Sequence, residues 1–123
     1  MRPVPLPDGW GEAALFEPNE TAWTDATRSY DHLGACLAWR VPAGMHGACD
    51  MERADKDVGA LPAQLGVAED GFLERWVVAE SCAKTLDVPM ALWLQQRGLA
   101  SLTGLGIHCT KADRQVMAFC RKD

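Results

Sequence analysis

The chain has 123 residues, of which 48% are apolar and 24% are charged, and its formal net charge is −5. This length supports one hydrophobic core but not two, so the sequence predicts a single domain. The apolar content excludes a largely disordered chain, and the longest uncharged stretch, residues 98–110, is too short and too rich in glycine to cross a bilayer.

The amino terminus and the cysteines both predict a cytoplasmic protein. The first seven residues contain three prolines and lack the apolar helical segment of a signal peptide. The five cysteines are an odd number without dense, regular spacing, which in the cytoplasm is typical of reduced thiols packed as small apolar side chains.

Residues 1–20 are expected to form an extended, proline-containing arm that precedes one globular α+β domain over residues 21–123. Proline fixes the backbone and removes a hydrogen-bond donor, so the four prolines of the arm argue against regular structure before Pro18. Trp10 and Phe16 are expected to attach the arm to the domain.

A helix is predicted over residues 22–33. Apolar residues follow one another there at spacings of three, four and three, which places them on one face of a helix. They are Trp23, Ala26, Tyr30 and Leu33. Gly34 can adopt the left-handed conformation that ends a helix.

A β-hairpin is predicted from residues 35–41 and 45–51, because side chains alternate at period two on both sides of a turn at residues 42–44. Pairing these strands places Trp39 opposite Gly47, where the missing side chain leaves room for the indole.

Two helices are predicted next, over residues 70–86 and 89–97, from apolar spacing and helix-end residues. Glu80 and Lys84 form an i,i+4 pair on the first helix. A single helical turn is expected at residues 62–65.

The carboxyl-terminal region fits two structures. Residues 105–109 and 115–120 can form two strands, whereas Thr110 followed by Asp113 resembles the start of a helix. The strands are favoured. The predicted fold is therefore α+β, with antiparallel β-hairpins packed against about three helices.

Acidic residues concentrate in residues 50–70, which carry six acidic and two basic side chains. Such a field repels phosphate, so nucleic acid is an unlikely ligand, and it favours a protein partner with a basic surface. The candidate contact residues are Asp50, Glu52, Asp55 and Asp57. The alternative is a solvated loop that keeps the protein soluble.

Trp93 is the candidate aromatic contact for a partner. The chain has five tryptophans, and those at positions 23, 39 and 76 are expected in the core. Met90, Leu92 and Trp93 spread around the short helix, so one small domain is not expected to bury them all. Self-association is the first candidate for covering Trp93, and a different protein is the second.

Residues that could carry other chemistry are few. The helix pair over residues 70–97 resembles a DNA-binding motif, but Arg97 is the only cation on its second helix. No phosphate-binding loop or catalytic set is present. A zinc site or a thiol-dependent site remains an alternative, with ligands or reactive groups drawn from His46, Cys49, His108 and Cys109.

The leading hypothesis is therefore a small, acidic, cytoplasmic binding protein without enzymatic activity, cofactor or metal. It would occupy a basic surface on another macromolecule, as immunity proteins and phage-encoded inhibitors do, a comparison by class alone. The alternatives are the metal-supported or thiol-dependent domain and a structural subunit of a homo-oligomer.

Overall fold

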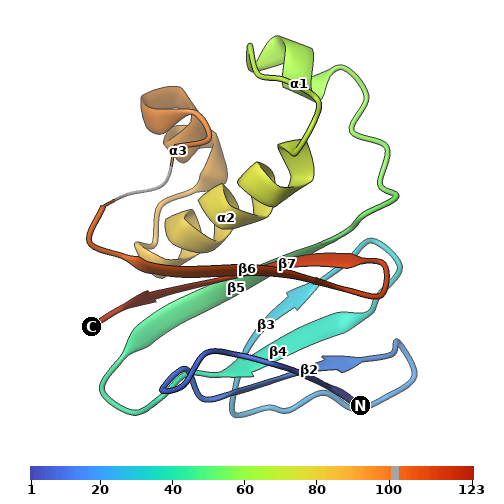
Figure 1. Ribbon diagram of the computed structural model, residues 1–123, viewed down its shortest axis with the longest axis vertical. Coiled ribbons are helices and arrows are strands. Elements are labelled where there is room, and N and C mark those ends of the chain that lie inside the picture. The colour runs from blue at the N-terminus through green and yellow to red at the C-terminus, as the bar shows by residue number, and fades with distance from the viewer. Residues whose placement is uncertain (101–102) are drawn as a thin grey trace.

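Three layers of secondary structure lie on one another in the computed structural model, which describes residues 1–100 and 103–123 (Figure 1). A four-stranded sheet, here called sheet A, packs on a three-stranded sheet, sheet B. The helices cover the opposite face of sheet B. This arrangement confirms the predicted α+β class.

All strand pairs of both sheets are antiparallel. Sheet A has the order β1-β2-β4-β3, formed by Arg2–Val4, Glu12–Phe16, Cys36–Arg40 and Thr27–Tyr30. Sheet B has the order β5-β7-β6, formed by His46–Arg53, Gln115–Lys122 and Gly106–Ala112. The strands predicted over residues 105–109 and 115–120 are thus confirmed, and they pair as neighbours.

The described helices are α1 (Leu61–Gln64), α2 (Phe72–Thr85) and α3 (Met90–Arg97). They confirm the helical turn and the two helices predicted from spacing. Helix α2 packs against β5 and β7, and α3 packs against α2. Within the described ranges, none of the helices has the length and apolar composition needed to cross a membrane.

The main core lies between the two sheets, and Trp39 is at its centre. Its side chain is fully buried, stacks on Trp10 at 5.9 Å between ring centroids and meets Phe119 edge-on at 5.4 Å. The indole N–H donates a 2.7 Å hydrogen bond to the backbone oxygen of Trp10. This contact satisfies the one polar atom of a large buried side chain.

Regular structure begins well before Pro18, contrary to the prediction for the arm. Strand β1 pairs with β2, and Pro3 lies opposite Ala14. A proline is tolerated there because β1 is an edge strand and need not donate to a further neighbour. Trp10 and Phe16 are buried, as expected of residues that hold this segment in place.

The helix predicted over residues 22–33 is wrong, because the end of this segment is strand β3. A helical face would bury Tyr30 and Leu33 together, yet each is 57% exposed. Ser29 is buried between exposed neighbours instead, as the period of a strand requires. Gly34 has the predicted positive φ, but it closes a turn from Asp31.

The predicted hairpin between residues 35–41 and 45–51 is also wrong, although both strands exist. Strand β4 pairs with β2 and β3, while β5 pairs with β7 in the other sheet. A Cβ atom on Gly47 would lie 2.8 Å from the Trp39 ring. The expected contact between Trp39 and Gly47 therefore forms across the two sheets and not along a hairpin.

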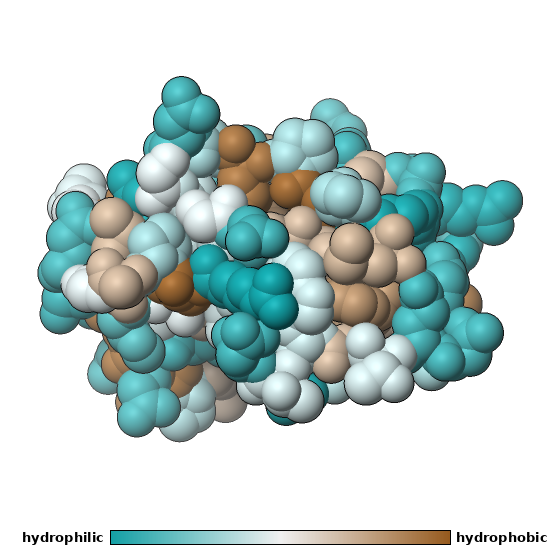
Figure 2. Space-filling model, turned by 90° about the horizontal axis from the view of Figure 1, so that it is seen from below, coloured by the Kyte–Doolittle hydropathy of each residue, from teal (hydrophilic) through white to brown (hydrophobic). Residues whose placement is uncertain are grey.

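The outer face of sheet A is partly apolar. Phe16 and Cys36 are buried there beneath Trp23 and Ala26, and the Arg40 guanidinium lies 3.8 Å from the centre of the Trp23 ring. Figure 2 views this side, where hydrophobic residues form separate groups divided by hydrophilic ones. Residues 22–26 thus act as a cover for the sheet.

Candidate functional site

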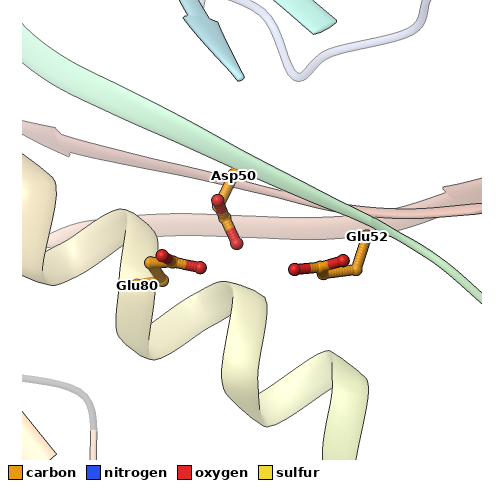
Figure 3. Close-up of side chains that lie close together, drawn as sticks. All are labelled: Asp50, Glu52 and Glu80. Atoms are coloured by element: carbon orange, nitrogen blue, oxygen red, sulfur yellow. The ribbon is translucent and has the colours of Figure 1, made fainter. Parts of the chain in front are cut away.

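Three carboxylates converge between strand β5 and helix α2. Asp50 and Glu52 project from the same side of β5, and Glu80 extends toward them from α2 (Figure 3). One oxygen from each carboxylate lies within 4.8 Å of the other two. Residues two apart on a strand share a face, so the β5 backbone itself directs the first pair toward the helix.

Asp50 is the most buried member of this cluster, with 5% of its side chain exposed. Its Oδ1 atom accepts hydrogen bonds from Ser29 Oγ at 3.2 Å and from Lys84 Nζ at 2.8 Å. Its Oδ2 atom is buried, and no nitrogen or hydroxyl group in the described part of the chain donates a hydrogen bond to it. A buried carboxylate oxygen without a partner carries a high desolvation cost, so this atom is the unusual feature of the site.

The protonation of Asp50 reflects this environment. Burial, followed by contact with Glu80, raises the pKa of Asp50 to about 8, while Lys84 acts in the opposite direction. Burial lowers the pKa of Lys84, but the charge of Asp50, its hydrogen bond to Lys84 and the charge of Glu80 together outweigh burial, so the net pKa is raised. Asp50 and Lys84 therefore each favour the charged form of the other.

Two neighbours fix the remaining geometry of the cluster. The indole N–H of Trp76 donates to Glu80 Oε2 at 3.1 Å. Ser29 Oγ accepts a hydrogen bond from the backbone N–H of Met51 at 3.2 Å and so connects sheet A to the strand that carries Asp50. Both contacts limit the rotamers of the carboxylates.

The predicted acidic contact residues separate into two pairs. Asp50 is buried, so its expected role on an exposed interface is wrong, and Glu52 is half-buried with Lys56 Nζ 3.1 Å from its Oε1. Asp55 and Asp57 are exposed. The Arg53 guanidinium holds the pKa of Asp55 below its ordinary value.

Trp93 is fully buried, so the prediction of an exposed indole is wrong. It packs on the small residues of α2, which leave space for the ring. These contacts are Ala79, Cys82 and Ala83. Leu92 faces outward instead and is 41% exposed. Helix α3 buries its largest side chain because α2 presents a face of small residues to it.

A shallow groove lies between residues 54–61 and the first turns of α2, with a volume of about 220 Å³ in its larger hollow. Its apolar lining comprises Val58, Leu61, Phe72, Leu73, Trp76 and Val116. Its acidic lining comprises Asp57, Glu69, Asp70 and Glu74, and its basic lining comprises Lys56 and Lys111, which pair with Glu52 and Glu74. Among the ion pairs of the described residues, none involves the first three of these acids.

The histidines and cysteines considered as zinc ligands or thiol catalysts do not come together. Cys49 faces the core, where burial raises its pKa to about 12, and Cys109 is exposed on β6. His108 lies against Trp10 and Phe119. In the described part of the chain, the only group of three or more metal-binding side chains in ligand range is the carboxylate cluster.

Sequence reasoning missed Glu80, the third carboxylate of the cluster, and Lys84, which binds Asp50. Glu80 and Lys84 were recognisable as an i,i+4 pair, which is usually a surface feature. The available signal was Asp50 itself, a charged residue between Cys49 and Met51 in a strand of otherwise buried character. A charge at such a position requires a partner from another element.

Comparison of the chain with known protein families, curated proteins and solved structures finds no match. No enzyme family therefore bears on its activity, and its function must be argued from geometry and charge.

Proposed function

We propose that the protein is a non-enzymatic binding protein whose groove between residues 54–61 and α2 takes a basic segment of another protein. The observation that supports this proposal is an apolar floor beside carboxylates that have no ion-pair partner. Lysine and arginine side chains suit such a surface, because their apolar stems pack while the charged ends reach acidic groups.

The net negative charge of the whole chain also favours a basic partner. A net charge of −5 attracts a basic partner at long range and repels nucleic acid. Asp57 is exposed and so accessible to a partner, whereas Asp50 and Trp93 are buried. The proposal thus retains the class of partner predicted from the sequence and moves the contact surface to the groove.

The odd number of cysteines, five, suits a reducing compartment, and a cytoplasmic location is part of the same proposal. Such a surface suits an inhibitor of a basic enzyme or toxin, because complementary charge speeds association with the target.

A labelled amphipathic peptide of alternating leucine and lysine tests the proposal by fluorescence anisotropy. We expect saturable binding that weakens with added salt and is lost in the double variant Glu69→Lys/Asp70→Lys. The control Asp8→Lys/Asp123→Lys makes the same change in net charge at exposed positions outside the groove. Equal loss of binding in both variants, or no binding by the unmodified protein, would contradict the proposal.

A further inference from the structure

The carboxylate cluster on β5 and α2 contains more negative charge than its neighbours compensate. Asp50, Glu52 and Glu80 supply three carboxylates, and the ammonium groups in contact with them belong to Lys84 and Lys56. One negative charge is therefore left over when all these groups are ionised. Uncompensated charge at a buried position calls for a further cation or proton.

The buried Oδ2 atom of Asp50 shows where that cation would lie. Asp50 is 3% exposed, and both donors to its side chain, Ser29 and Lys84, bind the other oxygen. Within the described residues, no nitrogen or hydroxyl group donates a hydrogen bond to its Oδ2. In Figure 3 the three carboxylates point toward one another from β5 and α2.

The distances between the carboxylate oxygens are short enough for all three to coordinate a single ion. Their mutual distances are within 4.8 Å, and two ligands of a calcium ion, each at about 2.3 to 2.6 Å, lie at most about 5 Å apart. Carboxylates are hard oxygen ligands, which favour magnesium, calcium and manganese over zinc or copper. Glu52 and Glu80 are half-buried, so an ion can enter from solvent and keep several water ligands.

We propose that Asp50, Glu52 and Glu80 bind a hard divalent cation between strand β5 and helix α2. The ion would join the two elements by three carboxylates. Lys84 would remain on Asp50 Oδ1, where it orients the carboxylate.

Charged and polar groups face Asp50 from three elements. Glu80 and Lys84 face it from α2, Glu52 is its charged neighbour on β5, and Ser29 faces it from β3. A cation bound here would therefore contact carboxylates from both β5 and α2.

Manganese is the most direct probe, because protein-bound manganese loses the electron paramagnetic resonance signal of the free ion. We expect saturable binding of one ion per chain, detected also by calorimetry, with competition by calcium or magnesium. Glu80→Gln should weaken binding by at least about tenfold, since even the loss of an outer-shell contact costs that much. Glu12→Gln is the matched control, because Glu12 is exposed on sheet A.

Trp76 provides a second readout, since its indole N–H binds Glu80 Oε2. Cation binding should change its fluorescence, and Trp76→Phe should remove that change while calorimetric binding persists. Circular dichroism establishes that each variant is folded. The absence of saturable binding up to about 10 mM, above the range of weak protein calcium sites, would overturn the proposal. Unchanged affinity in folded Glu80→Gln would also overturn it.

Discussion

The two faces of sheet B differ in kind, although the same two strands form most of both. Toward sheet A, β5 and β7 present Cys49, Met51, Met117 and Phe119, all fully or almost fully buried. Toward α2, β7 remains apolar while β5 presents Asp50 and Glu52. One face is therefore closed by apolar packing, and the other holds interacting charges.

Strand β5 therefore contributes apolar packing on one face and interacting charges on the other. Burial of apolar surface stabilises the fold without regard to direction, whereas a buried charge is retained only where it has partners or a ligand. We therefore expect substitutions on the sheet A side to lower the free energy of unfolding strongly. Substitutions on the α2 side should change its dependence on pH and on cations.

The largest effect is expected for Trp39→Ala, which removes the central side chain between the sheets. The cavity should lower the free energy of unfolding by about 3 to 5 kcal/mol, measured by urea denaturation. Trp23→Ala is the comparison on the outer face of sheet A, where the indole is half-buried, and its cost should be clearly smaller. Equal costs would contradict the placement of Trp39 at the centre of the core.

Gly47→Ala is expected to have the next largest effect. Its added methyl group would lie 2.8 Å from both the Trp39 ring and the backbone oxygen of Cys120. Overpacking of this kind should cost about 1 to 3 kcal/mol. A double-mutant cycle with Trp39→Phe tests the contact, because the smaller ring should reduce the cost of the methyl group. Strictly additive costs would argue against contact across the sheets.

On the α2 side, the free energy of unfolding should fall as the pH rises from about 5 to about 8. Asp50 has a pKa raised from 3.8 to about 8 by burial and by Glu80, so the folded state binds a proton that the unfolded state has lost. This stabilisation of the folded state is complete below 3.8, the ordinary pKa of aspartate, and disappears as the pH approaches 8.

Asp50→Asn should flatten this dependence by at least about 1.4 kcal/mol, the free energy that corresponds to one pKa unit. Thermal unfolding measured across the pH range, without divalent cations, provides the comparison. Asp55→Asn is the control, because the lowered pKa of exposed Asp55 acts at more acidic pH. A steep fall that persists in Asp50→Asn would assign the effect to another group.

The smallest effect is expected for Leu92→Ser at the exposed side of α3. Leu92 is 41% exposed, so the free energy of unfolding should stay within about 0.5 kcal/mol of the unmodified protein. Its neighbour Trp93 is fully buried, and Trp93→Ala should cost several times more. Reversed costs for these adjacent positions would mean that the helix is rotated relative to α2.

The elements predicted well from sequence are those specified by local spacing. Helices α2 and α3 have such spacing together with helix-end residues, and they formed as expected, whereas the region of β6 and β7 also fitted a helix. Residues 22–33 fit a helical period equally well, but the sheets compete for the same residues. Ser29 bonds to Asp50, 21 positions away, and no local pattern contains that information.

The strand pairing and the site could not be predicted from local patterns, because both depend on contacts between residues far apart in the chain. Strand β4 was expected beside β5, whereas its partners come from earlier in the chain, β2 and β3. No local pattern could show that Glu80 lies opposite Asp50 and Glu52. The burial of Trp93 likewise depends on the small residues of α2.

Pro3 in strand β1 has a consequence for how copies of this protein meet one another. An unpaired strand at the border of a sheet invites a strand from a second molecule, which is the first step toward fibrils. Proline interrupts the row of N–H donors needed for that addition, at the middle of a strand of three residues. The N-terminal border of sheet A is therefore protected against intermolecular growth by the residue that made this segment look unstructured.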